Sequence, residues 1–261
     1  MILCFIIEND KIVFGFMRDG TLIASASLSA VVGRTEDEYA VMLREILSLH
    51  GISAGDFCGA ICASVLPSLT ETVRGAVFRL LGFRAHLIGS GIRTGLKIGT
   101  ENPTELGGDL VASAVGATHL YPGEPLILVS VGTAITFSAI DKGGVFLGCA
   151  IAPGYRLASG ALCASAGLLP QVTNTVPKAT IGKNTAESLQ SGTLFGTAAM
   201  IDGMLDRMEA EMGVSARVLV TGSESSTVLP LCRHTAEERA ELALLGLSLI
   251  YERNESKRKA K

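Results

Sequence analysis

The sequence predicts an α/β protein built from two similar lobes with mixed sheets. Residues 2–27 and residues 126–150 each contain three short apolar runs separated by turns. Further strand and helix patterns follow each triplet, so helices are expected to cover the sheets. No low-complexity linker separates the halves, and we expect lobes at residues 1–118 and 119–261.

The first half reads as strand, strand, strand, helix, strand, helix, strand. Asp19-Gly20 is a hairpin turn signal between the second and third runs. Tyr39, Met42, Leu43 and Ile46 recur at helical spacing. The expected strands are 2–7, 12–16, 21–27, 58–65 and 85–88, and the expected helices are 36–50, 68–81 and 103–119.

The second half begins with the same pattern. Strands are expected at 125–130, 134–140 and 145–151, with a turn at residues 141–144. A helix is expected at 185–212, a strand at 217–221 and a helical C-terminus after that. Asn184 or Thr185 suits the N-cap of the long helix.

Composition excludes several classes of protein. The chain has 22 basic and 25 acidic residues, without the basic excess of a dedicated nucleic-acid binder. No apolar stretch approaches the roughly 20 residues that span a bilayer, so we expect a cytoplasmic protein with no membrane or nucleic-acid partner. The six cysteines sit mostly in apolar runs and predict reduced core thiols, with no metal site.

Three segments are candidates for chemistry. Gly132 and Thr133 form a turn between strands that could cradle a phosphate or simply close a hairpin. Asp109 follows Gly107 and Gly108 in the expected helix 103–119. Glycines lower helix propensity by about 1 kcal/mol each, which points to close approach of a ligand.

An aspartate at position 109 could take a proton from a substrate hydroxyl. Alternatively, it could cap the helix or simply face solvent. Thr185 lies at a helix start beside Lys183, where either an anion site or capping alone would explain the residues.

Together these segments resemble the type III pantothenate kinases, over nearly the whole chain. The resemblance rests on motifs that occur in the family's order: 12–15 (IVFG), 64–69 (SVLPSL), Asn102-Pro103, Glu105 with Gly107 and Asp109, 132–137 (GTAITF), 147–154 (LGCAIAPG), 181–185 (IGKNT), 189–192 (LQSG), 201–203 (IDG) and 249–254 (LIYERN). It implies the duplicated fold of acetate and sugar kinases, Hsp70 and actin, with ribonuclease H-like lobes. It also implies a dimer that phosphorylates pantothenate with ATP and Mg²⁺, and a monovalent cation, K⁺ or NH₄⁺.

The resemblance assigns roles to individual residues. The family's catalytic base falls on Asp109, in a segment that places Gly107 and Gly108 beside the substrate. Its second phosphate loop falls on Gly132 and Thr133, and its pantothenate-contacting threonine, supplied across the dimer, falls on Thr185. Of the first phosphate loop, Asp-x-Gly-Asn-Thr-Asn in the family, Asn9 is kept for the nucleotide.

The rest of that loop departs from the family. Ile6 replaces the metal-associated aspartate, Glu8 replaces the glycine, and Asp10 replaces the threonine. At about 4 Å and an effective dielectric constant near 20, each contact of an acid with the polyphosphate costs roughly 4 kcal/mol. Elsewhere, Ser130 replaces a cation-binding aspartate, and Leu110 replaces the arginine that holds the substrate carboxylate.

The departures indicate a family member whose own ATP site is degraded. We interpret the chain as a subunit of a hetero-oligomeric pantothenate kinase, a pseudoenzyme by itself that completes the substrate site of an intact paralogue. Two alternatives stay open: a homodimeric kinase active with an altered nucleotide loop, and a non-catalytic regulatory or accessory protein.

Overall fold

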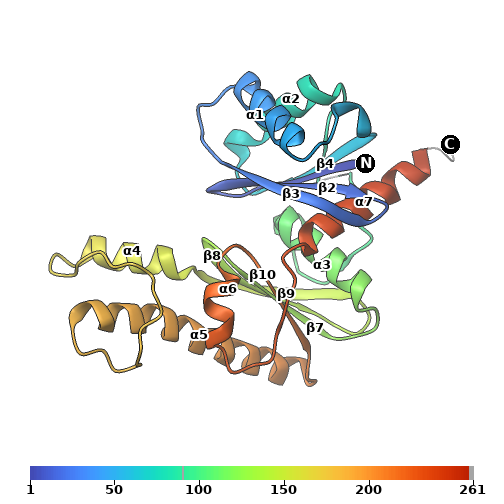
Figure 1. The fold of residues 1–261 in the computed structure, drawn as a ribbon. Helices are drawn as coiled ribbons and strands as arrows, with labels where there is room; N and C mark the ends of the chain where they lie inside the picture. Colours follow the sequence, from blue (N-terminus) through green and yellow to red (C-terminus); the bar gives the residue numbers. More distant parts are fainter. Residues whose placement is uncertain (90, 259–261) are drawn as a thin grey trace. The chain divides into compact units, whose positions relative to one another are not determined.

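The computed structural model describes residues 1–89 and 91–258. By its contacts the described part of the chain divides into two compact units, one of residues 1–89, 91–121 and 241–258 and one of residues 122–240 (Figure 1). The expected second lobe ran to residue 261. The structure differs there, because the apolar C-terminal helix packs within the first unit.

The first unit is built on a mixed five-stranded sheet in the order β3-β2-β1-β4-β5. Its strands are β1 (Ile2–Ile7), β2 (Lys11–Arg18), β3 (Thr21–Ser29), β4 (Gly59–Ser64) and β5 (His86–Leu87). β1 pairs antiparallel with β2 and parallel with β4. Every residue of β1 is buried, as expected of a central strand covered on both faces.

Side chains of β1 alternate between two cores. Leu3, Phe5 and Ile7 pack with helices α1 (Glu36–Leu49) and α2 (Pro67–Leu81). Ile2, Cys4 and Ile6 face the opposite way and pack with α3 (Gly108–Leu120) and α7 (Leu242–Arg258). The period of two along a strand therefore decides which helices cover each face of the sheet. Short 3₁₀ turns at Ala54–Asp56 and Pro103–Glu105 and a two-residue strand β6 (Lys97–Ile98) complete this unit.

The second unit repeats the pattern with β7 (Leu126–Val131), β8 (Ala134–Ile140), β9 (Val145–Pro153), β10 (Arg217–Thr221) and β11 (Glu237–Glu238). These strands lie in the order β11-β10-β7-β8-β9. The long helix α5 (Thr185–Met212) packs Leu194, Ile201 and Leu205 onto the sheet. The unit also holds α4 (Tyr155–Ser165), α6 (Ser225–Val228) and a 3₁₀ turn at Leu229–Leu231.

The predicted repeat of the strand triplet is confirmed. In each unit the first strand pairs antiparallel with the second and parallel with the fourth, which in turn pairs parallel with the fifth. Both outer hairpins even carry an irregularity at the same place, after the sixth residue of the second strand: between Phe16 and Met17, and between Ala139 and Ile140.

Other expectations are corrected. The helix predicted at 103–119 is a 3₁₀ turn followed by α3, because Leu106 is extended (φ −71°, ψ 122°) and interrupts the helix. The helix α4 was not anticipated. Among the cysteines, Cys4 and Cys62 are buried, whereas Cys58 and Cys149 are exposed, so core thiols describe only part of the set. Within the described ranges, the helices are too short or too polar to cross a membrane.

Two glycines let α3 and α7 approach closely. A Cβ atom on Gly246 would lie 1.8 Å from the Ala112 carbonyl oxygen, and one on Gly116 would lie 2.3 Å from that of Leu242. We expect Gly246→Ala to lower the free energy of unfolding by about 1–3 kcal/mol through overpacking. Gly160→Ala is the matched control, because no atom lies within 4 Å of its Cβ position on α4. Urea unfolding checks both, and equal stabilities would contradict the close approach.

Candidate active site

The first candidate loop joins β1 to β2 through Glu8, Asn9 and Asp10. The Glu8 N–H donates to the Lys11 carbonyl at 2.8 Å, and the Ala30 N–H donates to the Asp10 carbonyl at 2.9 Å. Lys11 Nζ lies 3.8 Å from Glu8 Oε2. The backbone N–H of Glu8 is therefore already engaged within the hairpin.

The second candidate loop, Gly132-Thr133, joins β7 to β8 in the second unit. The Gly132 N–H donates to the Ala134 carbonyl at 3.0 Å, matching the bond that the Glu8 N–H makes in the first unit. The terminal strand pairs also correspond: Ile7 faces Ile12, and Val131 faces Ile135. Glu8 thus occupies the position that the chain's own repeat gives to a glycine.

Asp109 lies in the first turn of α3, not in the interior of a longer helix. Gly107 is the N-cap, and a Cβ atom there would lie 2.6 Å from Asp109 Oδ1. A Cβ atom on Gly108 would lie 3.2 Å from the Ile88 side chain and 3.4 Å from Ala63. One glycine therefore leaves room for the Asp109 carboxyl, and the other lets α3 rest on the end of β4. The expected penalty for glycines inside a helix does not apply.

The carboxyl groups of Glu8 and Asp109 both have a raised pKa at this edge of the first sheet. Burial raises the pKa of Asp109, partly opposed by hydrogen bonds from backbone N–H groups. Burial also raises the pKa of Glu8; Lys11 lowers it, and the charges of Asp10 and Asp109 raise it further. The net direction for Glu8 is upward. The charge of Asp109 therefore disfavours a negative charge on Glu8 in the first loop.

The raised pKa of Glu8 has a consequence for stability. A carboxyl group that binds its proton more tightly in the folded state stabilises that state below its usual pKa of 4.5 and loses this contribution as pH rises through the raised value. We expect Glu8→Gln to raise the melting temperature at pH 7 by about 1–2 °C, a small gain because the side chain is 37% exposed. The gain should shrink as the pH falls toward 4.5. Thermal melts at several pH values measure it, and a variant less stable at pH 7 would contradict the sign.

Thr185 is exposed at the first position of α5. The helix start is satisfied by its own residues: the Glu187 N–H donates to the Asn184 side chain at 2.9 Å, and the Lys183 N–H donates to Glu187 Oε2 at 2.8 Å. The sequence allowed either an anion site or helix capping alone at this position. The structure shows the capping arrangement, with Asn184 as the N-cap. A Cβ atom on Gly182 would lie 2.5 Å from the Ser188 nitrogen, so this glycine lets the segment lie against the helix.

The positions that depart from the family pattern lack its chemistry. Ile6 is 7% exposed and belongs to the apolar cluster with Val111 and Leu244, so that site offers no carboxylate. Leu110 is half-buried beside Asp109. Asn9, which matches the family pattern, is exposed at the tip of the first loop. The described residues contain no group of three or more His, Cys, Asp and Glu side chains suited to a metal ion.

Sequence reasoning missed the residues that support the second loop. The Gly154 N–H donates to the Thr133 carbonyl at 2.9 Å, and a Cβ atom on Gly154 would lie 2.0 Å from the Gly132 carbonyl oxygen. Pro153-Gly154 was visible as a motif, but its proximity to a turn 20 residues earlier depends on the strand pairing of β8 with β9.

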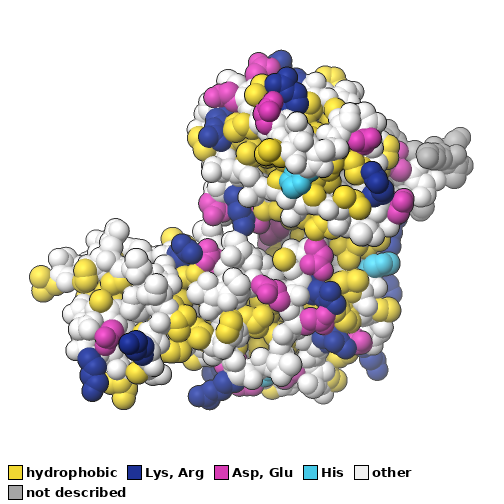
Figure 2. Space-filling view, in the orientation of Figure 1, with side chains coloured by type: hydrophobic (Ala, Val, Ile, Leu, Met, Phe, Trp, Pro, Cys, Tyr) yellow, Lys and Arg dark blue, Asp and Glu magenta, His cyan; other side chains and the backbone are white. Residues whose placement is uncertain are grey.

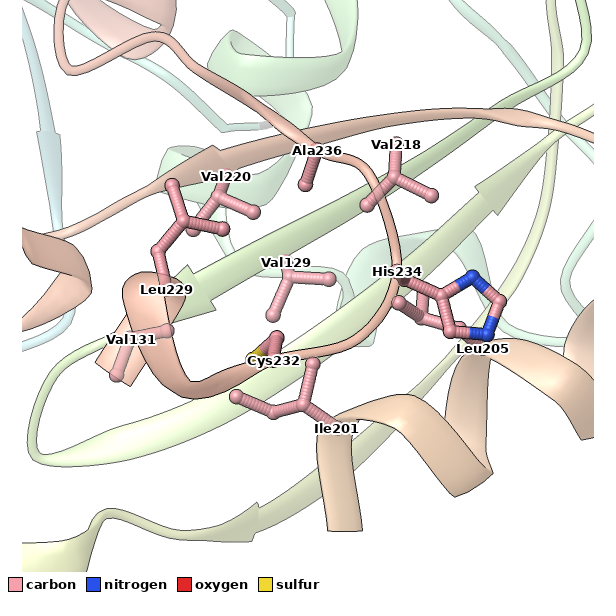
Figure 3. A pocket seen from close by; sticks show the side chains of 10 residues that line it. All are labelled: Val129, Val131, Ile201, Leu205, Val218, Val220, Leu229, Cys232, His234 and Ala236. Atoms are coloured by element: carbon pink, nitrogen blue, oxygen red, sulfur yellow. The ribbon is translucent and has the colours of Figure 1, made fainter. Parts of the chain in front are cut away.

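An internal cavity in the second unit is excluded as a substrate site. It measures about 10 Å³, room for roughly one water molecule. Apolar side chains such as Val129, Val220 and Leu229 point into it, with His234 at one side (Figure 3). It is a packing gap in the core between α5 and the sheet.

Comparison with known proteins identifies the family. A sequence model described as "Type III pantothenate kinase" matches residues 2–207. The chain belongs to the type III pantothenate kinase family. The type III pantothenate kinase of Moorella thermoacetica is 37% identical over 254 residues, covering 97% of this chain and 100% of that protein. That of Dehalococcoides mccartyi is 37% identical over 250 residues, covering 95% and 94%.

Solved structures agree on the fold of this type III pantothenate kinase family member. A putative Baf family transcriptional activator from Campylobacter jejuni gives a TM-score of 0.60 at 17% identity, covering 97% of this chain and 99% of that one. An activator of 2-hydroxyisocaproyl-CoA dehydratase from Clostridium difficile gives 0.58 at 12% identity, covering 99% and 97%. The fold is the duplicated α/β fold of the acetate and sugar kinase, Hsp70 and actin class.

Proposed function

We propose that the chain is a cytoplasmic subunit of a hetero-oligomeric kinase that phosphorylates pantothenate with ATP, the first step of coenzyme A synthesis. One observation carries the proposal: Glu8 stands in the first loop where the chain's own repeat has Gly132 in the second loop. The chain's own first loop is then unsuited to a polyphosphate. Residues that match the family elsewhere, such as Thr185, can still complete the substrate site of a second subunit.

The second loop fits a nucleotide better than the first. Gly132 and Thr133 keep the family's residues, and Thr133 is exposed with its hydroxyl available to a phosphate. In the first loop, Asn9 is kept, but Glu8 and Asp10 add negative charge. Repulsion at about 4 Å amounts to roughly 4 kcal/mol per contact before screening, more than a single neutral hydrogen bond returns.

The residues present do not fit the Mg²⁺ that accompanies ATP in kinases. Mg²⁺ takes one or two protein carboxylates together with phosphate oxygens. Here Ile6 is buried among apolar side chains, and Glu8 is paired with Lys11. Ser130 likewise offers no carboxylate to a monovalent cation. We therefore assign no chemical step to a metal ion held by this chain.

The residues that would contact pantothenate match the family pattern better than the first loop does. Asp109 would accept the proton of the pantothenate hydroxyl if this half-site were active, and its raised pKa suits a base. Gly107 and Gly108 let the backbone at the start of α3 approach the substrate. Leu110, in place of an arginine, removes a contact to the carboxylate worth roughly 1.5–3 kcal/mol.

The second unit carries a surface suited to association. In Figure 1, α4 and the start of α5 run side by side beyond the sheet of this unit, and we call them the arm (residues 155–200). Figure 2 shows hydrophobic side chains on its surface. Its exposed apolar residues are Leu157, Leu162, Leu168, Val176 and Ile181.

A groove of about 490 Å³ lies between α4 and α5 in the arm. Apolar patches of this kind mark protein interfaces, and Thr185 lies on the same arm. We propose that the arm binds a second subunit, either another copy of the chain or an intact paralogue, and carries Thr185 into that subunit's pantothenate site.

Co-expression with an intact family member from the same genome tests the proposal. We expect the two chains to purify together and the complex to phosphorylate pantothenate, while the chain alone shows little activity. Turnover by the chain alone at the rate of the complex would instead identify an independently active kinase. Absence of both a complex and any activity would favour an accessory protein.

A further inference from the structure

A polar cluster at the edge of the second sheet has no role in the function proposed above. Tyr155, the first residue of α4, is 2% exposed and donates its hydroxyl hydrogen bond to the Glu224 carboxylate. Arg156 Nε lies 2.9 Å from Glu224 Oε2, and the Glu224 side chain is 19% exposed. We call Tyr155, Arg156 and Glu224 the Glu224 latch.

The latch joins two segments that both hold the second loop. On one side, Gly154 immediately precedes Tyr155, and its N–H donates to the Thr133 carbonyl. On the other side, the Glu224 N–H donates to the Val131 carbonyl at 3.0 Å. Gly222 has φ +98°, and a Cβ atom there would lie 2.3 Å from the Val131 carbonyl oxygen. At Gly154 and at Gly222 there is therefore no room for a side chain between the segment and the second loop.

We propose that the Glu224 latch positions the Gly132-Thr133 turn for nucleotide, with Tyr155 and Glu224 as positioning residues. The inference rests on the assignment of Gly132 and Thr133 to the nucleotide under the proposed function. By fixing the distance between Gly154 and Gly222, the latch keeps the turn in one conformation before ligand arrives. A preset turn binds more tightly because less ordering is needed on binding.

The protonation state of the latch supports this role. Burial, followed by the hydrogen bond to Glu224, raises the pKa of Tyr155, so the phenol stays a donor at neutral pH. Arg156 donates to the same carboxylate, and hydrogen bonds to an ionised group are the stronger kind. The Glu224 carboxylate therefore contacts both Tyr155 and Arg156, while the Glu224 backbone N–H donates to the Val131 carbonyl.

Amide hydrogen exchange of the isolated chain tests the latch without any catalytic readout. We expect Tyr155→Phe and Glu224→Gln to speed exchange of the Gly132, Gly154 and Glu224 amides, each of which donates within this arrangement. Tyr39→Phe is the matched control: its side chain is 1% exposed, and its hydroxyl accepts from the Val31 N–H at 2.9 Å in the other unit. Unchanged exchange at the three amides, or an equal increase in Tyr39→Phe, would overturn the proposal.

The link to nucleotide is tested in a background that lacks the acids of the first loop. In the Glu8→Gly/Asp10→Thr variant, we expect Tyr155→Phe to weaken ATP binding by roughly tenfold, whereas Tyr39→Phe leaves the affinity unchanged. An unchanged affinity in Tyr155→Phe would overturn the positioning role. If the background itself fails to bind ATP, the assignment under the proposed function is at fault, and hydrogen exchange alone decides whether the latch exists.

Discussion

Replacing Glu8 by Gly and Asp10 by Thr is expected to raise the affinity of the isolated chain for ATP with Mg²⁺ by roughly 10- to 100-fold. Two unscreened contacts at about 4 Å would cost more, near 4 kcal/mol each, but both acids are partly exposed and Lys11 offsets part of the charge. Glycine at position 8 would also match Gly132 at the same place in the repeat. Calorimetric titration of the variant and the natural chain measures the gain.

Asp19→Asn is the matched control for this change. Asp19 lies at the other end of β2, in the turn to β3, and its φ of +50° is one that asparagine also tolerates. The substitution removes a surface acid from the neighbouring β2–β3 hairpin without touching the first loop. Equal gains in Asp19→Asn and in the double variant would mean that net charge, not the loop, controls affinity. No gain in the double variant would refute the electrostatic argument.

In a complex with an intact family member, substituting the intact partner's catalytic aspartate by asparagine is expected to abolish turnover. Asp109→Asn in this chain should leave most of it, because the half-site that contains Asp109 lacks a working first loop and the arginine at position 110. Steady-state kinetics of the co-purified complex measures both variants. Loss of activity in Asp109→Asn alone would make this chain the catalyst.

A smaller effect is expected from Thr185→Val in the same complex. The substitution keeps the β-branched shape and removes one hydrogen bond to pantothenate, which predicts a 2- to 13-fold weaker affinity for that substrate, or about 0.5–1.5 kcal/mol. Ser188→Ala, one turn later on the exposed side of α5, is the control. The Michaelis constant of the complex for pantothenate measures the effect. If Thr185→Val changes it no more than Ser188→Ala does, Thr185 does not contact the substrate.

The fold was predictable from local patterns, since each strand triplet is visible as apolar runs between turn residues. Asp19-Gly20 closes the β2–β3 hairpin as expected, and Asn184 caps α5. The assignment of the C-terminal helix to the first unit was not predictable in this way. It depends on Leu244, Leu247 and Ile250 covering one face of a sheet whose strands lie within residues 2–87, far earlier in the sequence.

In the candidate site, too, local features were predictable and contacts between distant segments were not. Asp109, Gly132 and Thr133 could be selected from residue type and spacing, and the family resemblance gave them roles. The close approach of Gly154 to Thr133, and of Gly222 to Val131, could not, because these contacts join segments brought together only by strand pairing. The reason for the two glycines before Asp109 was also missed, since it depends on where α3 begins.

Calorimetric titration of the isolated natural chain with ATP and Mg²⁺ tests the central claim most directly. The claim is that the first loop, with Ile6, Glu8 and Asp10, no longer accepts a polyphosphate. It predicts a dissociation constant in the millimolar range or above, because the two acids cost roughly 10- to 100-fold in affinity and Ile6 offers no carboxylate to the metal ion that accompanies the nucleotide. A dissociation constant in the low micromolar range would contradict it and establish a nucleotide site that works in this chain by itself.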